Sequence, residues 1–213
     1  MTWLARPPFA HADDWDDALE RDEAAVQCIA DAAALVDEWL AEYSPEHLLS
    51  TKLLAEWHAF LFRDVFPQFA GRIRNQSFPR EVHFSEFNGV GSRLVDNELR
   101  RYEGSVQNLI SQLDDYQSAS QEDFDTQVVR AAAWSHADFV RIHPFLNGNG
   151  RTGRLVIDYF AYRYNLNPVG IGRPSRSDYV SAMSFYVKYR DSANLCRFLL
   201  PLMIRPSGEP SRP

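Results

Sequence analysis

The residues best suited to chemistry lie together in one twelve-residue stretch, His143 to Arg154, which reads HPFLNGNGRTGR. Gly148-Asn149-Gly150 leads directly into a helical pattern, so unpaired backbone N–H groups and the positive end of a helix dipole are expected to converge there. A helix start of this kind binds anions, and glycine lets a phosphate approach the backbone closely. We therefore predict a phosphate site at the start of this helix.

Basic side chains flank the glycines on both sides. Arg151 and Arg154 are three residues apart in the first turn, so both project from one face toward the same anion. Two guanidinium groups at one site indicate more than one phosphate. His143 precedes the glycines and is followed by Pro144, and a histidine there can serve as a general base near neutral pH. Each feature alone has an ordinary explanation, but their conjunction favours a functional site.

Composition excludes several broad classes of protein. The chain has 213 residues, of which 45% are hydrophobic and 24% charged, a balance typical of one globular domain. Its net charge of -7 argues against non-specific binding to nucleic acid or anionic membranes. No apolar run approaches a membrane span of about 18 residues, and residues 1–8 lack the pattern of a signal peptide. We expect a cytoplasmic protein that binds neither nucleic acid nor membrane.

Cysteine and histidine spacing gives no sign of a structural metal or disulfide framework. Cys28 and Cys196 are too few for either a disulfide framework or a four-cysteine zinc site. His136 and His143 are seven residues apart and can share one helix face. Core packing or support of the motif explains this spacing better than a metal site with two histidines.

Helical patterns must position the site. Apolar residues recur at steps of three and four in six segments, at about 26–40, 49–60, 95–113, 124–142, 155–162 and 179–186. Ser44-Pro45 is expected to begin the second helix and Ser92 to cap the third. A short last helix starts near Leu195 and is expected to be interrupted at Pro201. The chain is therefore predicted to be mostly α.

One segment, between Gly71 and Gly91, breaks the helical pattern. Val82 and Phe84 alternate with polar residues as in a strand, and turn residues lie on both sides. The segment is either an irregular loop or a small exposed hairpin. An exposed strand edge can pair with a peptide by β-augmentation.

The His143–Arg154 stretch resembles the Fic motif, which runs His, any residue, Phe, any residue, Asp or Glu, Gly, Asn, Gly, Arg, two of any kind, Arg. It matches at every position except the acidic one, which is Asn147. Phe69–Arg74 is similar to the family's Trp-Ala-Gly-x-x-Arg segment, which leads into a target-docking flap. Residues 131–142 and 176–200 look like the helix that delivers the motif and the closing helices. The chain is thus identified as a member of the Fic/Doc superfamily, resembling short bacterial forms with Asn at the acidic position.

The resemblance implies an all-α fold, a Fic-type helical bundle with a small β-hairpin flap. The Fic domain is expected to span 23–204, with the flap at about 72–90 and the motif loop at 143–154. Residues 1–22 are expected to form an N-terminal tail and 205–213 a disordered C-terminal tail.

The resemblance also implies a protein adenylyltransferase, which moves AMP from ATP to a Ser, Thr or Tyr hydroxyl of a target protein with Mg²⁺. By position, His143 deprotonates the hydroxyl, Phe145 anchors the loop in the core, and Arg154 lies nearest the γ-phosphate. The nucleotide-binding residues are expected to be Gly148, Asn149, Gly150, Arg151 and Arg154. The residues expected to dock the target in the flap are Val82, His83 and Phe84.

Asn147 is the departure from the family pattern. An acidic residue there binds Mg²⁺, whereas an Asn oxygen can ligate the ion but brings no negative charge, so weaker metal binding is expected. This keeps three alternatives open: phosphorylation, UMP transfer, or a catalytically silent domain that binds nucleotide or another protein. Phosphorylation in the Doc manner is disfavoured because that motif has Lys where this chain has Gly150.

No clean copy of the family's inhibitory segment, Ser or Thr, three residues, Glu, then Gly or Asn, is present. Residues 118–122 have the spacing, but Asp123 follows them and the place reads as an ordinary helix start. Control is therefore expected from a small antitoxin-like inhibitor protein or from homo-oligomerisation, or is absent.

Overall fold

A computed structural model describes residues 22–44, 47–84, 87–116, 120–170 and 176–204. The α-helices of these segments are α2 (Glu23–Tyr43), α3 (Thr51–Phe62), α4 (Val95–Asp114), α5 (Gln121–Ile142), α6 (Asn149–Arg163), α7 (Arg176–Tyr189) and α8 (Ala193–Met203). Two short strands, β1 (His83–Phe84) and β2 (Phe87–Asn88), and a 3₁₀ turn η2 (Ser92–Leu94) complete the elements. The predicted all-α fold is confirmed.

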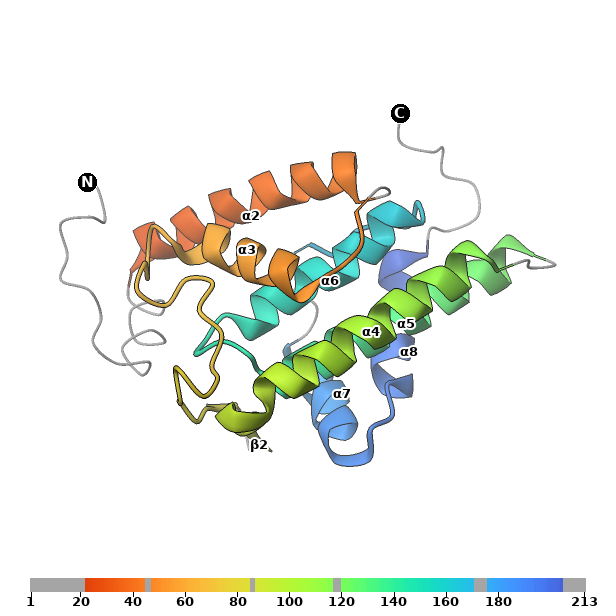
Figure 1. The fold of residues 1–213 in the computed structure, drawn as a ribbon. Coiled ribbons are helices and arrows are strands. Elements are labelled where there is room, and N and C mark those ends of the chain that lie inside the picture. Colours follow the sequence, from red (N-terminus) through yellow and green to blue (C-terminus); the bar gives the residue numbers. More distant parts are fainter. Residues whose placement is uncertain (1–21, 45–46, 85–86, 117–119, 171–175, 205–213) are drawn as a thin grey trace.

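Helix α5 is the centre of the bundle. It packs against α4, α6, α7 and α8, while α2 lies on α3 and α6 (Figure 1). Nearly every residue from Val128 to Ile142 is buried, which is the pattern of a helix enclosed on all sides. Since α5 ends at the motif loop and α6 begins there, the packing of these two helices fixes both ends of the loop.

The first two helices differ from the prediction at their ends. Ala25 lies in the buried stripe of α2, whereas Val26 is 49% exposed. Helix α3 begins at Thr51, not at the predicted Ser44-Pro45, because Ser50 is its N-cap and accepts the N–H of Leu53 at 3.2 Å. The N–H of Ser44 instead donates to Leu40 and extends α2.

Two further expectations were wrong in detail. Ser92 lies in η2 and does not cap α4, because its hydroxyl donates to Glu81 Oε1 at 2.9 Å. Helix α8 continues through Pro201 to Met203 and is not interrupted. The buried residues Leu195, Leu199 and Met203 are four apart, so core contacts on both sides of the proline hold the helix together.

The irregular segment contains the small hairpin expected of the flap. Strands β1 and β2 are antiparallel, with His83 opposite Asn88 and Phe84 opposite Phe87. Just before them, Asn75 and Phe78 form an isolated bridge. The hairpin lies between α3 and α4 in sequence and beside the end of α5 in space, because Val90 donates its N–H to the Ile142 carbonyl at 3.2 Å.

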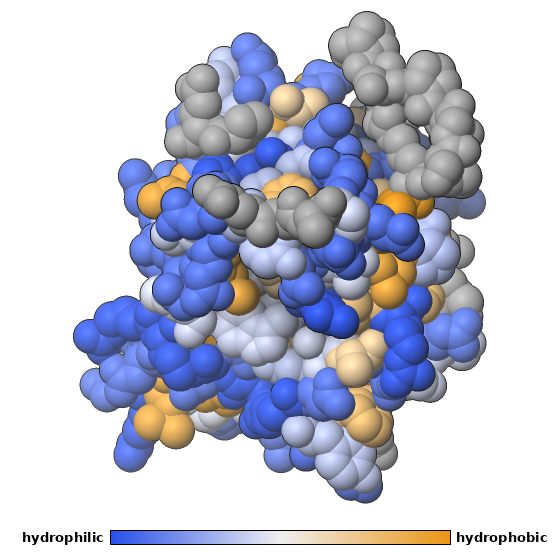
Figure 2. Space-filling view, turned by 90° about the vertical axis from the view of Figure 1, so that its right-hand side faces the viewer, coloured by the Kyte–Doolittle hydropathy of each residue, from blue (hydrophilic) through white to orange (hydrophobic). Residues whose placement is uncertain are grey.

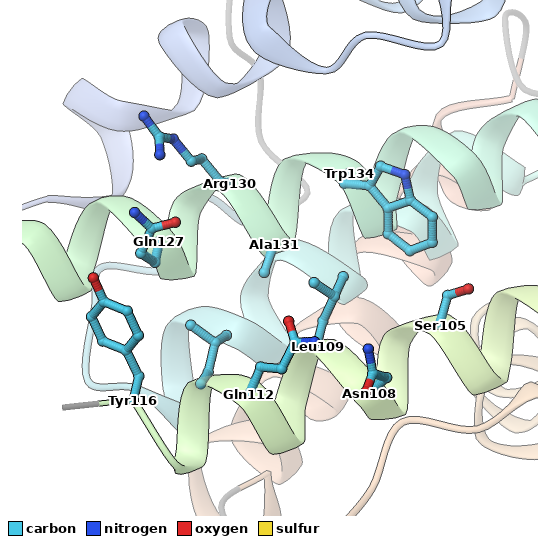
Figure 3. A pocket seen from close by; sticks show the side chains of 10 residues that line it. Ser105, Asn108, Leu109, Gln112, Tyr116, Gln127, Arg130, Ala131 and Trp134 are labelled. Atoms are coloured by element: carbon cyan, nitrogen blue, oxygen red, sulfur yellow. The ribbon is translucent and has the colours of Figure 1, made fainter. Parts of the chain in front are cut away.

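A groove between α4 and α5 lies away from the motif loop. Figure 3 shows its lining between α4 and α5, with Leu109, Ala131 and Trp134 forming an apolar floor. Its volume is about 470 Å³. Trp134 lies nine residues before His143 on α5, about 13 Å along the helix, so the groove is separate from the loop.

The outer surface is predominantly hydrophilic on the face that Figure 2 displays, with hydrophobic side chains in small separate groups. Within the described segments, no helix combines the length and the apolar character needed to cross a membrane. The described tertiary structure begins at Asp22, and both predicted tails, apart from Asp22, fall outside the described residues.

Candidate active site

The motif loop leaves α5 through a residue in left-handed conformation. His143 has φ 55°, and its N–H donates to the Phe139 carbonyl at 3.1 Å, which closes the last turn of α5. Gly148 has φ 75° and precedes α6. A Cβ atom on Gly148 would lie 2.4 Å from the ring of Phe62, so both the backbone conformation and the packing require glycine here.

Asn149 holds the loop in shape. Its Oδ1 accepts the N–H of Phe145 and its Nδ2 donates to the Phe145 carbonyl, both at 2.9 Å, and the residue is 1% exposed. The side chain is therefore committed to the loop, and the predicted nucleotide contact of Asn149 concerns only its backbone N–H. Phe145 itself is 1% exposed and packs against Phe139 and His58.

The start of α6 has the geometry of an anion cradle. The first backbone N–H groups of a helix have no acceptor within it, and here they belong to the residues that begin α6 at Asn149. A Cβ built on Gly150 would meet no atom within 4 Å, so the space in front of that residue is open. Backbone donors, the helix dipole and open space therefore coincide at Gly150.

Arg154 is a cation that lacks a counter-ion among the described residues. It is half-buried, and its Nε atom is buried with no hydrogen-bond partner among the residues that the structure describes. Burial lowers the pKa of Arg154, and the nearby Tyr179 and Asp158 raise it only in part. Because arginine remains charged even so, the site holds a desolvated positive charge that an anion would stabilise.

The carboxyl group of Asp158 does not serve as that counter-ion. Its Oδ1 accepts the N–H groups of Val169 at 2.6 Å and Gly170 at 3.1 Å, so it binds the loop that follows α6. Burial raises the pKa of Asp158 to about 7, even though Arg154 lowers it slightly. Burial therefore opposes the charged form of Asp158, and the backbone N–H groups occupy the oxygen that it presents.

The hydrogen bond of His143 assigns the tautomer of its ring. Its Nδ1 lies 3.1 Å from the Val140 carbonyl, and since a carbonyl only accepts, Nδ1 carries the proton and Nε2 the lone pair. Burial, together with the charge of Arg74, lowers the pKa of His143 to about 4. The ring is therefore neutral at physiological pH, with its lone pair on Nε2.

Arg74 ties the end of α5 to the flap. It is completely buried, and its guanidinium donates to backbone carbonyls. Nε and Nη2 donate to the His143 carbonyl at 2.8 and 2.6 Å, and Nη2 also lies 3.3 Å from the Ile142 carbonyl. Nη1 donates to Arg80 at 2.7 Å and Nη2 to Val90 at 2.9 Å. One side chain thus holds His143 and both arms of the flap.

The flap meets His143 at Gly89. A Cβ on Gly89 would lie 2.9 Å from the Cβ of His143, and the Gly89 N–H donates to the Val82 carbonyl at 3.0 Å. The side chain of Val82 is 8% exposed and packs inward, whereas His83 is exposed. The side chain of Phe84 falls outside what the structure describes. Of the three predicted docking residues, Val82 can therefore offer only its backbone to a target.

A metal ion would find a sparse donor set here. Among the described residues, no three His, Cys, Asp or Glu side chains come close enough together to bind one. At the motif loop the candidate ligand is Asn147, whose Oδ1 accepts the N–H of Gly148 at 2.5 Å. A carbonyl oxygen has two lone pairs, so this contact does not prevent ligation, but the amide contributes no charge. The residues therefore fit a Mg²⁺ ion bound mainly by phosphate and water.

Two buried residues that hold the loop were not recognised as such from the sequence. The sequence patterns place Arg74 only within the Phe69–Arg74 segment and give no role to His58. The available signal for His58 was its place in the apolar stripe of α3, next to Trp57, which marks a buried imidazole. The helix start expected near residues 118–122 is present, with Ser120 as N-cap of α5, while residues 118 and 119 lie outside the described part.

Comparison with known proteins decides the family. A profile described as "Fic/DOC family" matches residues 48–161, more than half of the chain. The chain belongs to the Fic/DOC family. Protein adenylyltransferase fic-1 of Caenorhabditis briggsae is 26% identical over 137 residues, which are 64% of this chain and 24% of that protein. Protein adenylyltransferase Fic of Drosophila persimilis is 45% identical over 51 residues, 24% of this chain and 10% of that protein.

Solved structures show the same fold. The BepC protein of Bartonella tribocorum, determined with bound AMPPNP, has a TM-score of 0.68 at 17% identity and covers 90% of this chain and 89% of its own. Fic-1 of C. elegans has a TM-score of 0.59 at 21% identity, covering 82% of this chain and 46% of its own. The Fic domain described here spans about a quarter of the length of the curated fic-1 relatives.

Replacing Arg74 by Met should destabilise the Fic domain by about 3 kcal/mol or more, because four backbone carbonyls lose a charged donor inside the protein. Urea unfolding measures the change. Arg100→Met is the matched control, since Arg100 is exposed on α4 and bonds only within its own helix, and should change stability by less than about 0.5 kcal/mol. Equal effects of the two substitutions would show that Arg74 does not hold the flap and α5 together.

Proposed function

We propose that this Fic domain transfers AMP from ATP to the hydroxyl group of a Ser, Thr or Tyr side chain in a target protein. The observation that carries the proposal is the grouping at the start of α6: an open helix N-terminus at Gly150, the half-buried cation of Arg154, which forms no ion pair with the described residues, and a neutral base at His143. The relatives that are named protein adenylyltransferases support AMP as the transferred group.

In the proposed reaction, the target hydroxyl oxygen attacks the α-phosphorus and forms a new P–O bond. Nε2 of His143 accepts the hydroxyl proton, and the bond between the α-phosphorus and the bridging oxygen breaks, releasing pyrophosphate. His143 suits this step because its Nδ1–H is held by the Val140 carbonyl, which fixes both the tautomer and the ring direction.

The start of α6 would bind the phosphates. The backbone N–H groups of Asn149 and Gly150, which follow the Gly148 N–H held by Asn147 Oδ1, are suited to the oxygens on which negative charge grows in the transition state. Arg151 and Arg154 would bind the outer phosphates, with Arg154 nearest the γ-phosphate. The half-buried position of Arg154 strengthens such a contact, because little water is available to screen it.

Asn147 would hold a Mg²⁺ ion through its Oδ1. When bound, the ion neutralises phosphate charge. The loop geometry does not depend on the charge at this position, because Asn149 and His58 hold the loop by its backbone. The absence of a carboxylate at Asn147 favours a second candidate function, a nucleotide-binding domain without catalytic activity.

The flap would bind the target, with the backbone of Val82 and the exposed His83 at its docking edge and Phe84 beside them. Control by a partner is part of the proposal, since Arg154 has no carboxylate partner in the described segments. An inhibitor protein of the antitoxin type would supply that carboxylate, and self-association is the alternative.

ATP labelled at either the α- or the γ-phosphorus, incubated with lysate and the Fic domain, tests the reaction. We expect label in protein from the α position only, and a loss of about 10²–10⁴-fold in rate for His143→Ala with ATP affinity changed by less than a few-fold. Label from the γ position would indicate phosphorylation. No transfer from either position would favour the silent domain, and full activity of His143→Ala would remove His143 from the mechanism.

Arg154→Ala should weaken binding of ATP more than binding of ADP, because the proposed contact is to the terminal phosphate. One charge-assisted hydrogen bond is worth roughly 1.5–3 kcal/mol, or about 10- to 150-fold in affinity. Calorimetry with both nucleotides measures this difference. Arg130→Ala, at an exposed arginine of α5, is the control and should leave both affinities unchanged. Equal losses for ATP and ADP would contradict the assigned contact of Arg154.

Asn147→Asp should tighten Mg²⁺ binding in the presence of ATP by about 10-fold and raise the transfer rate at limiting Mg²⁺. Asp has nearly the shape of Asn, and its added charge acts on a divalent ion a few ångströms away, worth on the order of 1–4 kcal/mol in partly solvated surroundings. A titration of rate against Mg²⁺ concentration measures both effects. A slower reaction at saturating Mg²⁺ would show that Asn147 does not act as a metal ligand.

A further inference from the structure

The side chain of His58 lies between its own helix, α3, and the motif loop, and it also meets the start of the flap segment. It is fully buried, and its ring stacks on Phe145 of the motif loop with centroids 3.8 Å apart and an interplanar angle of 23°. Phe62 packs on it at 4.7 Å. The ring therefore lies between the helix and the loop. Any flat side chain could make these packing contacts.

The hydrogen bonds of the ring assign its tautomer. The backbone N–H of Gly71 lies 2.8 Å from Nδ1, and because an N–H can only donate, Nδ1 must be unprotonated. With Nδ1 unprotonated, the ring carries its proton on Nε2. Nε2 then donates to the Asn147 carbonyl at 3.0 Å. One imidazole thus accepts from the residue that begins the flap segment and donates to the motif loop.

The donation to Asn147 sets the direction of a peptide plane. In a trans peptide the C=O and N–H groups point in opposite directions. With the Asn147 carbonyl held on His58, the N–H of Gly148 must point to the opposite side, where Asn147 Oδ1 accepts it. The backbone passes directly against the ring, since a Cβ on Gly148 would lie 3.1 Å from Nε2.

We propose that His58 is a positioning residue for the transfer reaction: its Nε2–H orients the Asn147–Gly148 peptide from which the phosphate cradle begins. Its Nδ1 joins the same peptide to Gly71, where the flap segment starts. This inference rests on the proposed function, because the orientation of the cradle matters to the rate only if the cradle binds reacting phosphates. A shift of about 1 Å in such a group costs on the order of 10²-fold in rate.

Three substitutions separate the two hydrogen bonds from packing. His58→Gln places an amide near the position of Nε2 and keeps a donor for the Asn147 carbonyl. His58→Asn reaches only the position of Nδ1 and keeps an acceptor for Gly71. His58→Phe keeps an aromatic ring against Phe145 and loses both hydrogen bonds. His47→Gln is the control, because His47 is exposed before α3 and its ring contacts the Tyr43 carbonyl.

The rate of transfer and the affinity for ATP, the latter by calorimetry, are measured for each variant after thermal melting has shown it to be folded. We expect His58→Phe and His58→Asn to lose about 10²-fold in kcat and up to about 10-fold in ATP affinity. His58→Gln should stay within about 3-fold of wild type in both, and His47→Gln should match wild type. A wild-type kcat in His58→Phe would show that His58 contributes only packing. Activity retained in His58→Asn but lost in His58→Gln would show that the hydrogen bond to Gly71, and not the one to Asn147, carries the role.

The tautomer is tested on the wild-type chain, independently of variants and of activity. ¹⁵N-labelled histidine should show an unprotonated Nδ1 and a protonated Nε2 for His58, and the reverse assignment would overturn the inference. If wild type transfers no label, the proposed function is wrong. The order of ATP affinities among the three variants then still decides whether His58 orients the cradle.

Discussion

A buried arginine whose partners are backbone carbonyls is the constraint on which the site depends. The last carbonyls of a helix have no partner within it and carry the negative end of its dipole, so a cation placed against them is favourable. Arg74 occupies that place at the end of α5, and its guanidinium also donates to the carbonyls of Arg80 and Val90. Because a buried charge without these acceptors would be very costly, His143 and the flap can separate only if the core opens.

The motif loop is fixed at three points by contacts to its backbone. Arg74 holds the His143 carbonyl, Asn149 holds both polar groups of Phe145, and His58 holds the Asn147 carbonyl. Each contact is made to a main-chain group and does not depend on the type of side chain at that position. The type of residue at position 147 can therefore vary in charge while the loop keeps its shape, so the amide of Asn147 is compatible with this loop.

The features that local physics determines were predictable from the sequence. The helices follow from periodicity, and the cradle follows from glycines placed before a helix that carries Arg151 and Arg154. The start of α3 was not predictable from the sequence, because Ser44 and Ser50 are equally good N-caps. Tertiary packing determines that Ser50 is the N-cap. The roles of Arg74 and His58 depend on carbonyl partners 69 and 89 residues away. Every residue has a backbone carbonyl, so the sequence does not indicate which one is the partner.

The charged groups of the candidate site affect the protonation of His143. The chain is acidic overall, yet Arg74, Arg151 and Arg154 gather around the end of α5 and the start of α6. Burial, to which the charge of Arg74 adds, lowers the pKa of His143 to about 4, so the ring is neutral. Under the proposed function, a bound polyphosphate would bring negative charge to the same place and favour the protonated imidazole. The basicity of Nε2 would then rise on nucleotide binding, whereas before binding, burial and the charge of Arg74 keep the ring unprotonated.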